Sequence, residues 1–270
     1  MQRNIKLSLW IIFFTAVIII LGSFKNEESG LISPLLRPNL NSVIKNSLNE
    51  YQGKFGIFIK NLKTNETFSL NENQFFKPAS FYKLKLMVLA FKALKEGQLS
   101  EDDVLSADIK ELNDSFDIAT ETAELTEGTI ELTVKSALEQ MITISHNYSA
   151  LLLTKTLAAE NLAEDTTAKE IAQFFDSLYK GEIIDAEYSK KMLDLLSRQK
   201  INDRISKYLP KEIKIAHKTA DIDFFEHDAG VVFTPKGDYI IVILTESGKP
   251  ESTREKIAEI SKSVYEYFNN

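Results

Sequence analysis

Ser and Lys stand three residues apart at four places in this sequence, a spacing at which one helical turn brings an amine beside a hydroxyl. The pairs are Ser42/Lys45, Ser80/Lys83, Ser177/Lys180 and Ser197/Lys200. Such a hydroxyl becomes a nucleophile when a base removes its proton, and a Lys serves as that base only if burial or a nearby cation lowers its pKa. The spacing alone is a weak signal, because chance supplies about two such pairs in this chain.

Context favours Ser80 and Lys83. Ser80 follows an extended Phe-Lys-Pro-Ala segment and begins a strongly apolar helical pattern, where a helix N-terminus and its N–H groups stabilise developing negative charge. The other pairs lie within helices or at helix ends, each with a Lys expected to be solvated. The alternative is that Ser80 is only a helix N-cap and Lys83 is exposed.

Two further polar clusters follow downstream. Ser145-His146-Asn147 lies at the junction of two predicted helices and offers a second hydroxyl and a carboxamide. Lys218-Thr219-Ala220 ends a predicted strand, and an edge strand can present a cation, a hydroxyl and free N–H groups to a bound carboxylate and carbonyl. The alternatives are that Ser145-His146-Asn147 only caps a helix and that Lys218-Thr219 only protects a sheet edge. The occurrence of all three motifs in this order along the chain favours a shared site.

The elements that must position these clusters follow from periodicity and turn residues. Helical patterns cover residues 39–51, 80–94, 132–141, 147–159, 167–179, 186–196 and 251–268, and strand patterns cover residues 55–59, 67–70, 213–218, 227–233 and 239–244. The acidic, Thr-rich stretch 108–129 is predicted to be irregular. The strands near the two ends of the chain must then pair in one sheet, and the segment between them in the sequence is helical.

This order predicts an α+β fold with two lobes. We expect an antiparallel sheet flanked by the terminal helices, from residues 38–79 and 211–270, and an inserted all-helical lobe over about residues 80–210. The cleft between the lobes is the expected place for a site.

Composition excludes several function classes. The chain has 32 Lys and Arg against 39 Asp and Glu, a net charge of −7, and no basic block beyond its first apolar segment, so we expect no nucleic-acid partner. The absence of Cys excludes disulfides, thiol nucleophiles and Fe–S clusters. Of the three His, His217 and His227 are more typical of structural hydrogen bonds than of metal ligands. We therefore expect no metal and no cofactor, and a monomer.

The N-terminal segment is typical of a membrane anchor or a signal peptide. Residues 7–24 carry no charge and follow Arg3 and Lys6, which is long enough to cross a bilayer and orients the rest of the chain to the outside. We expect residues 1–24 to be an uncleaved transmembrane anchor, residues 25–37 a linker and residues 38–270 an extracytoplasmic domain. A cleaved signal peptide, which would give a secreted protein, is the alternative.

With these motifs in place, the chain resembles the class A β-lactamase and penicillin-binding protein superfamily of active-site serine hydrolases. The resemblance covers about residues 38 to 270 and extends beyond the three clusters, through runs such as FFKPASFYKLKLMVLAFKALKEGQLSEDDV, LTVKSALEQMITISHNYSALLL and HKTADIDFFEHDAGVVFTPKGDYIIVILT. It implies an enzyme of the same two-lobed fold.

The resemblance also implies roles for individual residues. Ser80 would be the acylated nucleophile, Lys83 its proton acceptor, and Ser145 the group that passes a proton to the leaving nitrogen. Asn147 would orient the substrate and Lys83, while Lys218 and Thr219, beside Ala220, would hold the substrate carboxylate. The backbone N–H groups of Ser80 and Asp221 would form the oxyanion hole. Lys218 would be the cation that helps to lower the pKa of Lys83.

Three departures from the family pattern qualify these roles. His146 stands where class A enzymes usually carry Asp, and Ala220 stands where the family usually has Gly, so that its methyl group is expected to crowd the substrate. We expect the Ω-shaped loop, whose Glu activates the deacylating water in the family, to be missing, because only 18 residues separate Asn147 from Thr166. Glu160 and Glu164 lie in that connection as weak substitutes.

The sequence therefore predicts a β-lactamase-like serine hydrolase that forms an acyl-enzyme at Ser80 and opens β-lactam rings, with doubtful deacylation. The first alternative is a DD-peptidase or acyltransferase on peptidoglycan stem peptides, with a substrate like D-Ala-D-Ala. The second is a non-catalytic descendant that binds cell-wall fragments, favoured by the lost loop and Ala220.

Overall fold

The computed structural model describes residues 39–49 and 51–270, and the folded unit within it spans Leu40–Asn270. The predicted anchor at 1–24 and linker at 25–37 lie outside the described residues, so both stay predictions. Within the described part, no helix combines the length and the apolarity that a bilayer-spanning segment needs.

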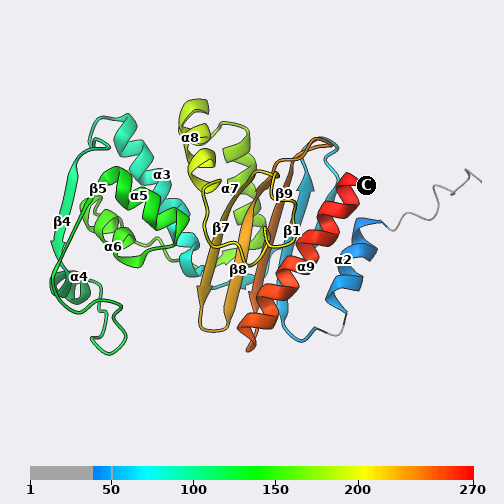
Figure 1. Cartoon of the computed structure of the whole chain (residues 1–270), viewed down its shortest axis with the longest axis horizontal. Helices are drawn as coiled ribbons and strands as arrows, with labels where there is room; N and C mark the ends of the chain where they lie inside the picture. The colour runs from blue at the N-terminus through cyan, green and yellow to red at the C-terminus, as the bar shows by residue number, and fades with distance from the viewer. Residues whose placement is uncertain (1–38, 50) are drawn as a thin grey trace, which may run out of the picture. The chain divides into compact units, whose positions relative to one another are not determined.

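A five-stranded antiparallel sheet joins the two ends of the folded unit, as the strand pattern predicts. Its order is β2 (Thr67–Leu70), β1 (Lys54–Asn61), β9 (Tyr239–Glu246), β8 (Phe225–Val232) and β7 (Ile215–Ile222). Strands β1 and β9 pair along their whole length, from Lys54 opposite Glu246 to Asn61 opposite Tyr239. Strand β7 is an edge strand and lies on the side of the helical lobe (Figure 1).

Both faces of the sheet are covered, which explains the continuous apolar run of β9. Ile241 and Ile243 face a core shared with α2 (Leu40–Leu48) and α9 (Pro250–Asn269). Val242 and Leu244 face the other core, which contains the buried face of α7 (Ala168–Tyr179). Figure 1 shows α9 and α2 on one side of the strands and α7 behind them.

The inserted lobe is mainly helical, built from α3 (Tyr82–Lys95), α4 (Ile109–Ser115), α5 (Val134–Thr143), α6 (Asn147–Thr156) and α8 (Ala186–Leu196). The expectation of an all-helical lobe over about residues 80–210 is wrong in two respects. Strands β4 (Val104–Asp108) and β5 (Thr129–Thr133) pair as a two-stranded ribbon within the lobe, and α7 packs on the sheet instead. A second short pair, β3 (Phe75–Phe76) with β6 (Thr166–Thr167), joins the segment before Ser80 to the start of α7. The α+β architecture itself is confirmed.

Strands β7 and β8 approach closely at one glycine. A Cβ atom added at Gly230 would lie 2.3 Å from the Ala216 carbonyl oxygen and 2.6 Å from the His217 Cβ. Only a residue without a side chain allows β8 to hold β7 at this distance. The strand that carries Lys218 therefore depends on Gly230 for its position.

Candidate active site

Residues of the first two polar clusters line one pocket of about 670 Å³, and the third cluster adjoins it because Lys218 donates to Ser145 Oγ. It is lined by Lys77, Pro78, Ala79, Ser80, Tyr82, Glu124, Ile144, Ser145, Asn147, Ala163, Asp165, Ile201, Asp221 and Ile222. Ser80, Ser145 and Asn147 thus face the same space as Asp221, although 141 positions separate the first from the last. Lys83 and Lys218 lie fully buried beneath this lining.

Ser80 lies in a single turn of 3-10 helix, Ala79–Phe81, directly before α3. His227 of β8 anchors this turn, because its ring stacks on Phe81 and its Nε2 lies 2.9 Å from the Lys77 carbonyl oxygen. Burial lowers the pKa of His227 to about 4, so the ring is neutral; Nδ1 accepts the Thr245 N–H and Nε2 donates to Lys77. The predicted structural role of His227 is confirmed, and the ring holds the segment that carries Ser80.

Lys83 reaches from α3 toward the second cluster. Its Nζ donates to the Ser145 carbonyl oxygen at 2.5 Å, to Asn147 Oδ1 at 2.7 Å and to Ser145 Oγ at 3.3 Å. The Ser80 hydroxyl forms no hydrogen bond with any described residue. Burial lowers the pKa of Lys83 to about 8, against the opposing effect of Glu124 and Asp221.

Lys218 approaches the same hydroxyl from β7. Its Nζ donates to Ser145 Oγ at 2.9 Å and to the Thr219 carbonyl oxygen at 2.6 Å. Burial, and next the charge of Lys83, lower the pKa of Lys218 to about 7. The expectation that Lys218 lowers the pKa of Lys83 needs correction: burial is the main cause at Lys83, and the effect of the neighbouring amine falls on Lys218. Two amines of depressed pKa thus flank one serine hydroxyl.

The Ser145-His146-Asn147 cluster combines capping and site geometry. His146 is the N-cap of α6, and its Nδ1 accepts the Ser149 N–H at 3.2 Å. Because His146 does the capping, the side chains of Ser145 and Asn147 are free to face Lys83. Ser145 itself has a φ of 57°, a left-handed conformation that is uncommon outside glycine.

Asn147 connects Lys83 to a carboxylate that the sequence analysis did not single out. Its Oδ1 accepts from Lys83, and its Nδ2 donates to Glu124 Oε1 at 2.6 Å. Glu124 comes from the stretch between α4 and β5, within the segment predicted to be irregular. No local pattern distinguishes it from the other acidic residues there, so only the fold reveals its place.

The end of β7 contributes differently from what was predicted. The Thr219 Oγ1 is buried and has no hydrogen-bond partner among the described residues, so a ligand oxygen could satisfy it. Ala220 is fully buried in the hydrophobic core and does not line the pocket, which contradicts the expected crowding of substrate by its methyl group. Asp221 lines the pocket, and its Oδ1 accepts from Arg204 at 3.0 Å.

The connection between α6 and β6 supplies a different acid from those considered. Glu160 and Glu164 are exposed and do not line the pocket, and Glu164 pairs with Lys85 at 3.4 Å. Asp165 does line it. The two glutamates named from the sequence are therefore not positioned to act on a bound acyl group.

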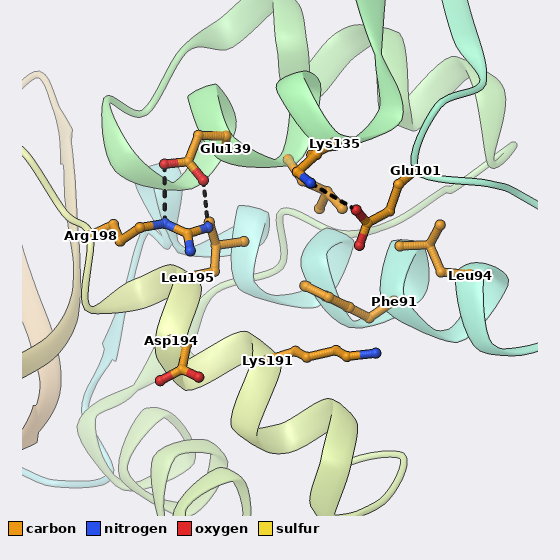
Figure 2. Close-up of a pocket in the computed structure, with 10 residues that line it drawn as sticks. Phe91, Leu94, Glu101, Lys135, Glu139, Lys191, Asp194, Leu195 and Arg198 are labelled. Atoms are coloured by element: carbon orange, nitrogen blue, oxygen red, sulfur yellow. Dashed lines mark hydrogen bonds and ion pairs between the residues drawn. The ribbon is translucent and has the colours of Figure 1, made fainter.

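Another cavity, of about 290 Å³, lies among α3, α5 and α8 (Figure 2). Phe91 and several leucines line it, and Glu139 with Arg198 and Glu101 with Lys135 form ion pairs across its rim. It has no hydroxyl or imidazole in its lining. In the part of the chain that the structure describes, no group of three or more His, Asp or Glu could hold a metal ion.

The fold and the pocket are those expected of a two-lobed, β-lactamase-like serine hydrolase. A family model described as "Beta-lactamase enzyme family" matches residues 39–165 and 155–268, which together cover most of the chain. The chain belongs to the beta-lactamase enzyme family. A search of curated protein sequences found no match.

Solved structures of the same fold include several with low sequence identity. A β-lactamase from Sphaerobacter thermophilus is 20% identical with a TM-score of 0.73, covering 85% of this chain and 96% of that one. A β-lactamase from Chitinophaga pinensis is 18% identical with a TM-score of 0.73, covering 86% and 100%. The protein PBP-A is 23% identical with a TM-score of 0.71, covering 85% and 95%, and a variant of it has been solved as an acyl-enzyme complex with penicillin G.

Proposed function

We propose that this protein is acylated at Ser80 by β-lactams and releases the opened product slowly. The observation that carries the proposal is the Ser145 hydroxyl, which receives hydrogen bonds from the buried amines of Lys83 and Lys218 in a pocket that Ser80 also lines. Together these groups can take a proton from the Ser80 hydroxyl and deliver one from the Ser145 hydroxyl to a leaving group.

In the proposed acylation, the neutral Lys83 amine takes the Ser80 proton while Oγ attacks the lactam carbonyl carbon. The backbone N–H groups of Ser80 and Asp221 stabilise the resulting oxyanion. The C–N bond then breaks, Ser145 gives its proton to the leaving nitrogen, and the proton held by Lys83 replaces it. Lys218 holds the Ser145 hydroxyl in place and, with Thr219, binds the substrate carboxylate.

Slow deacylation follows from the carboxylates around the pocket. A carboxylate that activates water is most effective next to the ester and with a pKa raised by burial. Glu160 and Glu164 do not line the pocket, and Glu124 and Asp165, which do, are exposed to solvent. Water attack on the ester therefore has no buried base to assist it among the described residues.

Intact mass after incubation of the 38–270 domain with a penicillin tests the proposal. We expect one covalent adduct that maps to Ser80 and is lost in Ser80→Ala. Ser177→Ala is the matched control, because Ser177 has the same spacing to a Lys but lies in α7 beside the Asp176 and Lys180 ion pair. An adduct that survives Ser80→Ala would refute the proposal, and an unmodified wild-type chain would refute it and favour a non-catalytic binder.

A DD-peptidase acting on peptidoglycan stem peptides is the second candidate. The shared fold with PBP-A and the acyl-enzyme solved for its variant favour it, because a persistent adduct is the expected response of a peptidase to a β-lactam. Release of D-Ala from a peptide ending in D-Ala-D-Ala, together with an adduct lasting for hours, would support the peptidase. Rapid turnover of the adduct would support a lactamase.

We also propose that the domain works outside the cytoplasmic membrane, on the strength of the uncharged run at residues 7–24 behind Arg3 and Lys6. Protease accessibility of the domain in spheroplasts that express the full chain tests this. Protection of the domain from added protease would contradict it.

A further inference from the structure

We propose that Glu124 sets the charge preference of the pocket and selects acyl donors that carry a cationic group next to the reacting amide. This inference rests on the proposed acylation of Ser80. It names a residue outside the three clusters and a substrate class, namely β-lactams or peptides with a free ammonium group on the acyl side.

The first observation is the position of Glu124 on Asn147. Its Oε1 accepts from Asn147 Nδ2 at 2.6 Å, while the other end of the same amide accepts from Lys83. A substrate group that reaches Asn147 therefore meets a carboxylate directly behind it.

The second observation is that this carboxylate forms no ion pair in the described part of the chain. Among the described residues, Glu124 forms no ion pair, and an amide neutralises no charge. At the β7 end of the pocket, by contrast, the carboxylate of Asp221 accepts from the buried Arg204. The negative charge at the Asn147 end is thus available to a ligand, whereas that at the β7 end is balanced within the protein.

The charge also acts across the pocket. It opposes the lowering of the pKa of Lys83 and adds to the burial that raises the pKa of Tyr82 to about 12. Asp165 lines the same pocket and likewise forms no ion pair among the described residues, so it adds to the negative potential. Lys77 is the one cation in the lining, against the two carboxylates of Glu124 and Asp165 that form no ion pair among the described residues.

Three penicillins that differ only at the α-carbon of a phenylacetyl side chain test the inference. One carries hydrogen there, one an ammonium group and one a carboxylate, and the second-order rate constant for adduct formation is measured for each. We expect the ammonium compound to react roughly tenfold faster than the carboxylate compound, as one unpaired charge at a partly exposed site allows. Glu124→Gln keeps an oxygen acceptor for Asn147. In this variant the ratio of the ammonium rate constant to the carboxylate rate constant should fall to a value between about 1 and 2.

Glu121→Gln and Glu127→Gln are the matched controls, because both residues stand near Glu124 in the same segment and neither lines the pocket. Each should keep the wild-type ratio. Raising the ionic strength should reduce the ratio in the wild type and leave Glu124→Gln unaffected.

The outcomes separate this inference from the proposed function. If no penicillin modifies Ser80, the proposed function itself fails. If all three modify Ser80 and Glu124→Gln leaves their ratio unchanged, the function stands and the inference is overturned. A longer adduct lifetime in Glu124→Gln, equal for all three compounds and without a change in ratio, would also overturn it and show that Glu124 assists deacylation.

Discussion

At the scale of single residues, the proposed acylation depends most on a neutral amine at Lys83. The side chain is fully buried, and burial lowers its pKa to about 8, so a substantial fraction of the amine is neutral near physiological pH. A protonated amine cannot accept the Ser80 proton, and removal of a positioned general base typically costs 10² to 10⁴ in rate.

We therefore predict that the acylation rate constant rises with pH through about 8 and levels off above it, because the neutral form of Lys83 is the active one. Lys83→Met should lower that rate constant by about a thousandfold. Lys85→Met is the control, since Lys85 is exposed on the same helix and pairs with Glu164. Stopped-flow measurements with a chromogenic β-lactam check both, and a rate independent of pH from about 6 to 9 would contradict the assigned base.

Residues whose chemistry depends on local pattern could be predicted from the sequence, and residues placed by the fold could not. Ser80 was distinguished from Ser42, Ser177 and Ser197 by its position at the start of an apolar helix, and the structure places it in the pocket. Glu124 lies 23 residues before Asn147 in the chain and meets it only because the segment between α4 and β5 folds back onto α6. The sequence of an acidic stretch does not indicate which of its carboxylates makes such a contact.

At the scale of elements, the edge strand β7 positions Lys218, Thr219 and Asp221, and its own position depends on β8. Gly230 permits the close approach of the two strands, since a Cβ there would overlap the backbone of β7. An overpacked core position typically costs 1 to 3 kcal/mol, and here the overlap is with backbone, which cannot rotate away.

Gly230→Ala should therefore lower the free energy of unfolding by about 3 kcal/mol and also slow acylation, because β7 must move away from Ser145. Urea denaturation and adduct formation measure the two effects. Gly248→Ala is the control, because a Cβ at Gly248 meets no atom within 4 Å, and it should change neither quantity. A folded Gly230→Ala variant of wild-type stability and rate would show that β7 does not depend on this contact.

Long apolar elements were predictable, and short polar ones were not. The continuous apolar run of β9 and the buried stripe of α7 follow directly from the sequence. Strands β4 and β5 have five residues each and are partly exposed, and α4 has seven residues, too few for a period to emerge. The ribbon was therefore missed and the lobe was expected to be wholly helical.

At the scale of the whole molecule, the site lowers the stability of the fold. Lys83 and Lys218 have pKa values of about 8 and about 7 in the folded chain, against 10.5 for an unperturbed Lys. At pH values between the folded-state pKa of each lysine and 10.5, the unfolded chain binds more protons than the folded chain. The free energy of unfolding therefore rises with pH over this range. Each proton of difference contributes about 1.4 kcal/mol per pH unit.

We predict that the free energy of unfolding increases by about 3 to 4 kcal/mol from about pH 7 to about pH 9. The double variant Lys83→Met, Lys218→Met should remove most of this dependence and be more stable at about pH 7, because it buries no amine. Chemical denaturation at several pH values measures the slope. The variant Lys85→Met, Lys190→Met removes two exposed amines and should keep the wild-type slope.

The pairing of β1 with β9 also determines when the chain can fold during synthesis. Strand β9 lies at the centre of the sheet, yet it is the last strand to leave the ribosome, and its partner β1 precedes it by about 180 residues. Until Glu246 has emerged, β1 and β8 have no strand between them, so the nascent chain cannot complete its sheet. The central strand is therefore the one that closes the sheet, and β1 reaches its final place only when the segment through Glu246 is available to pair with it.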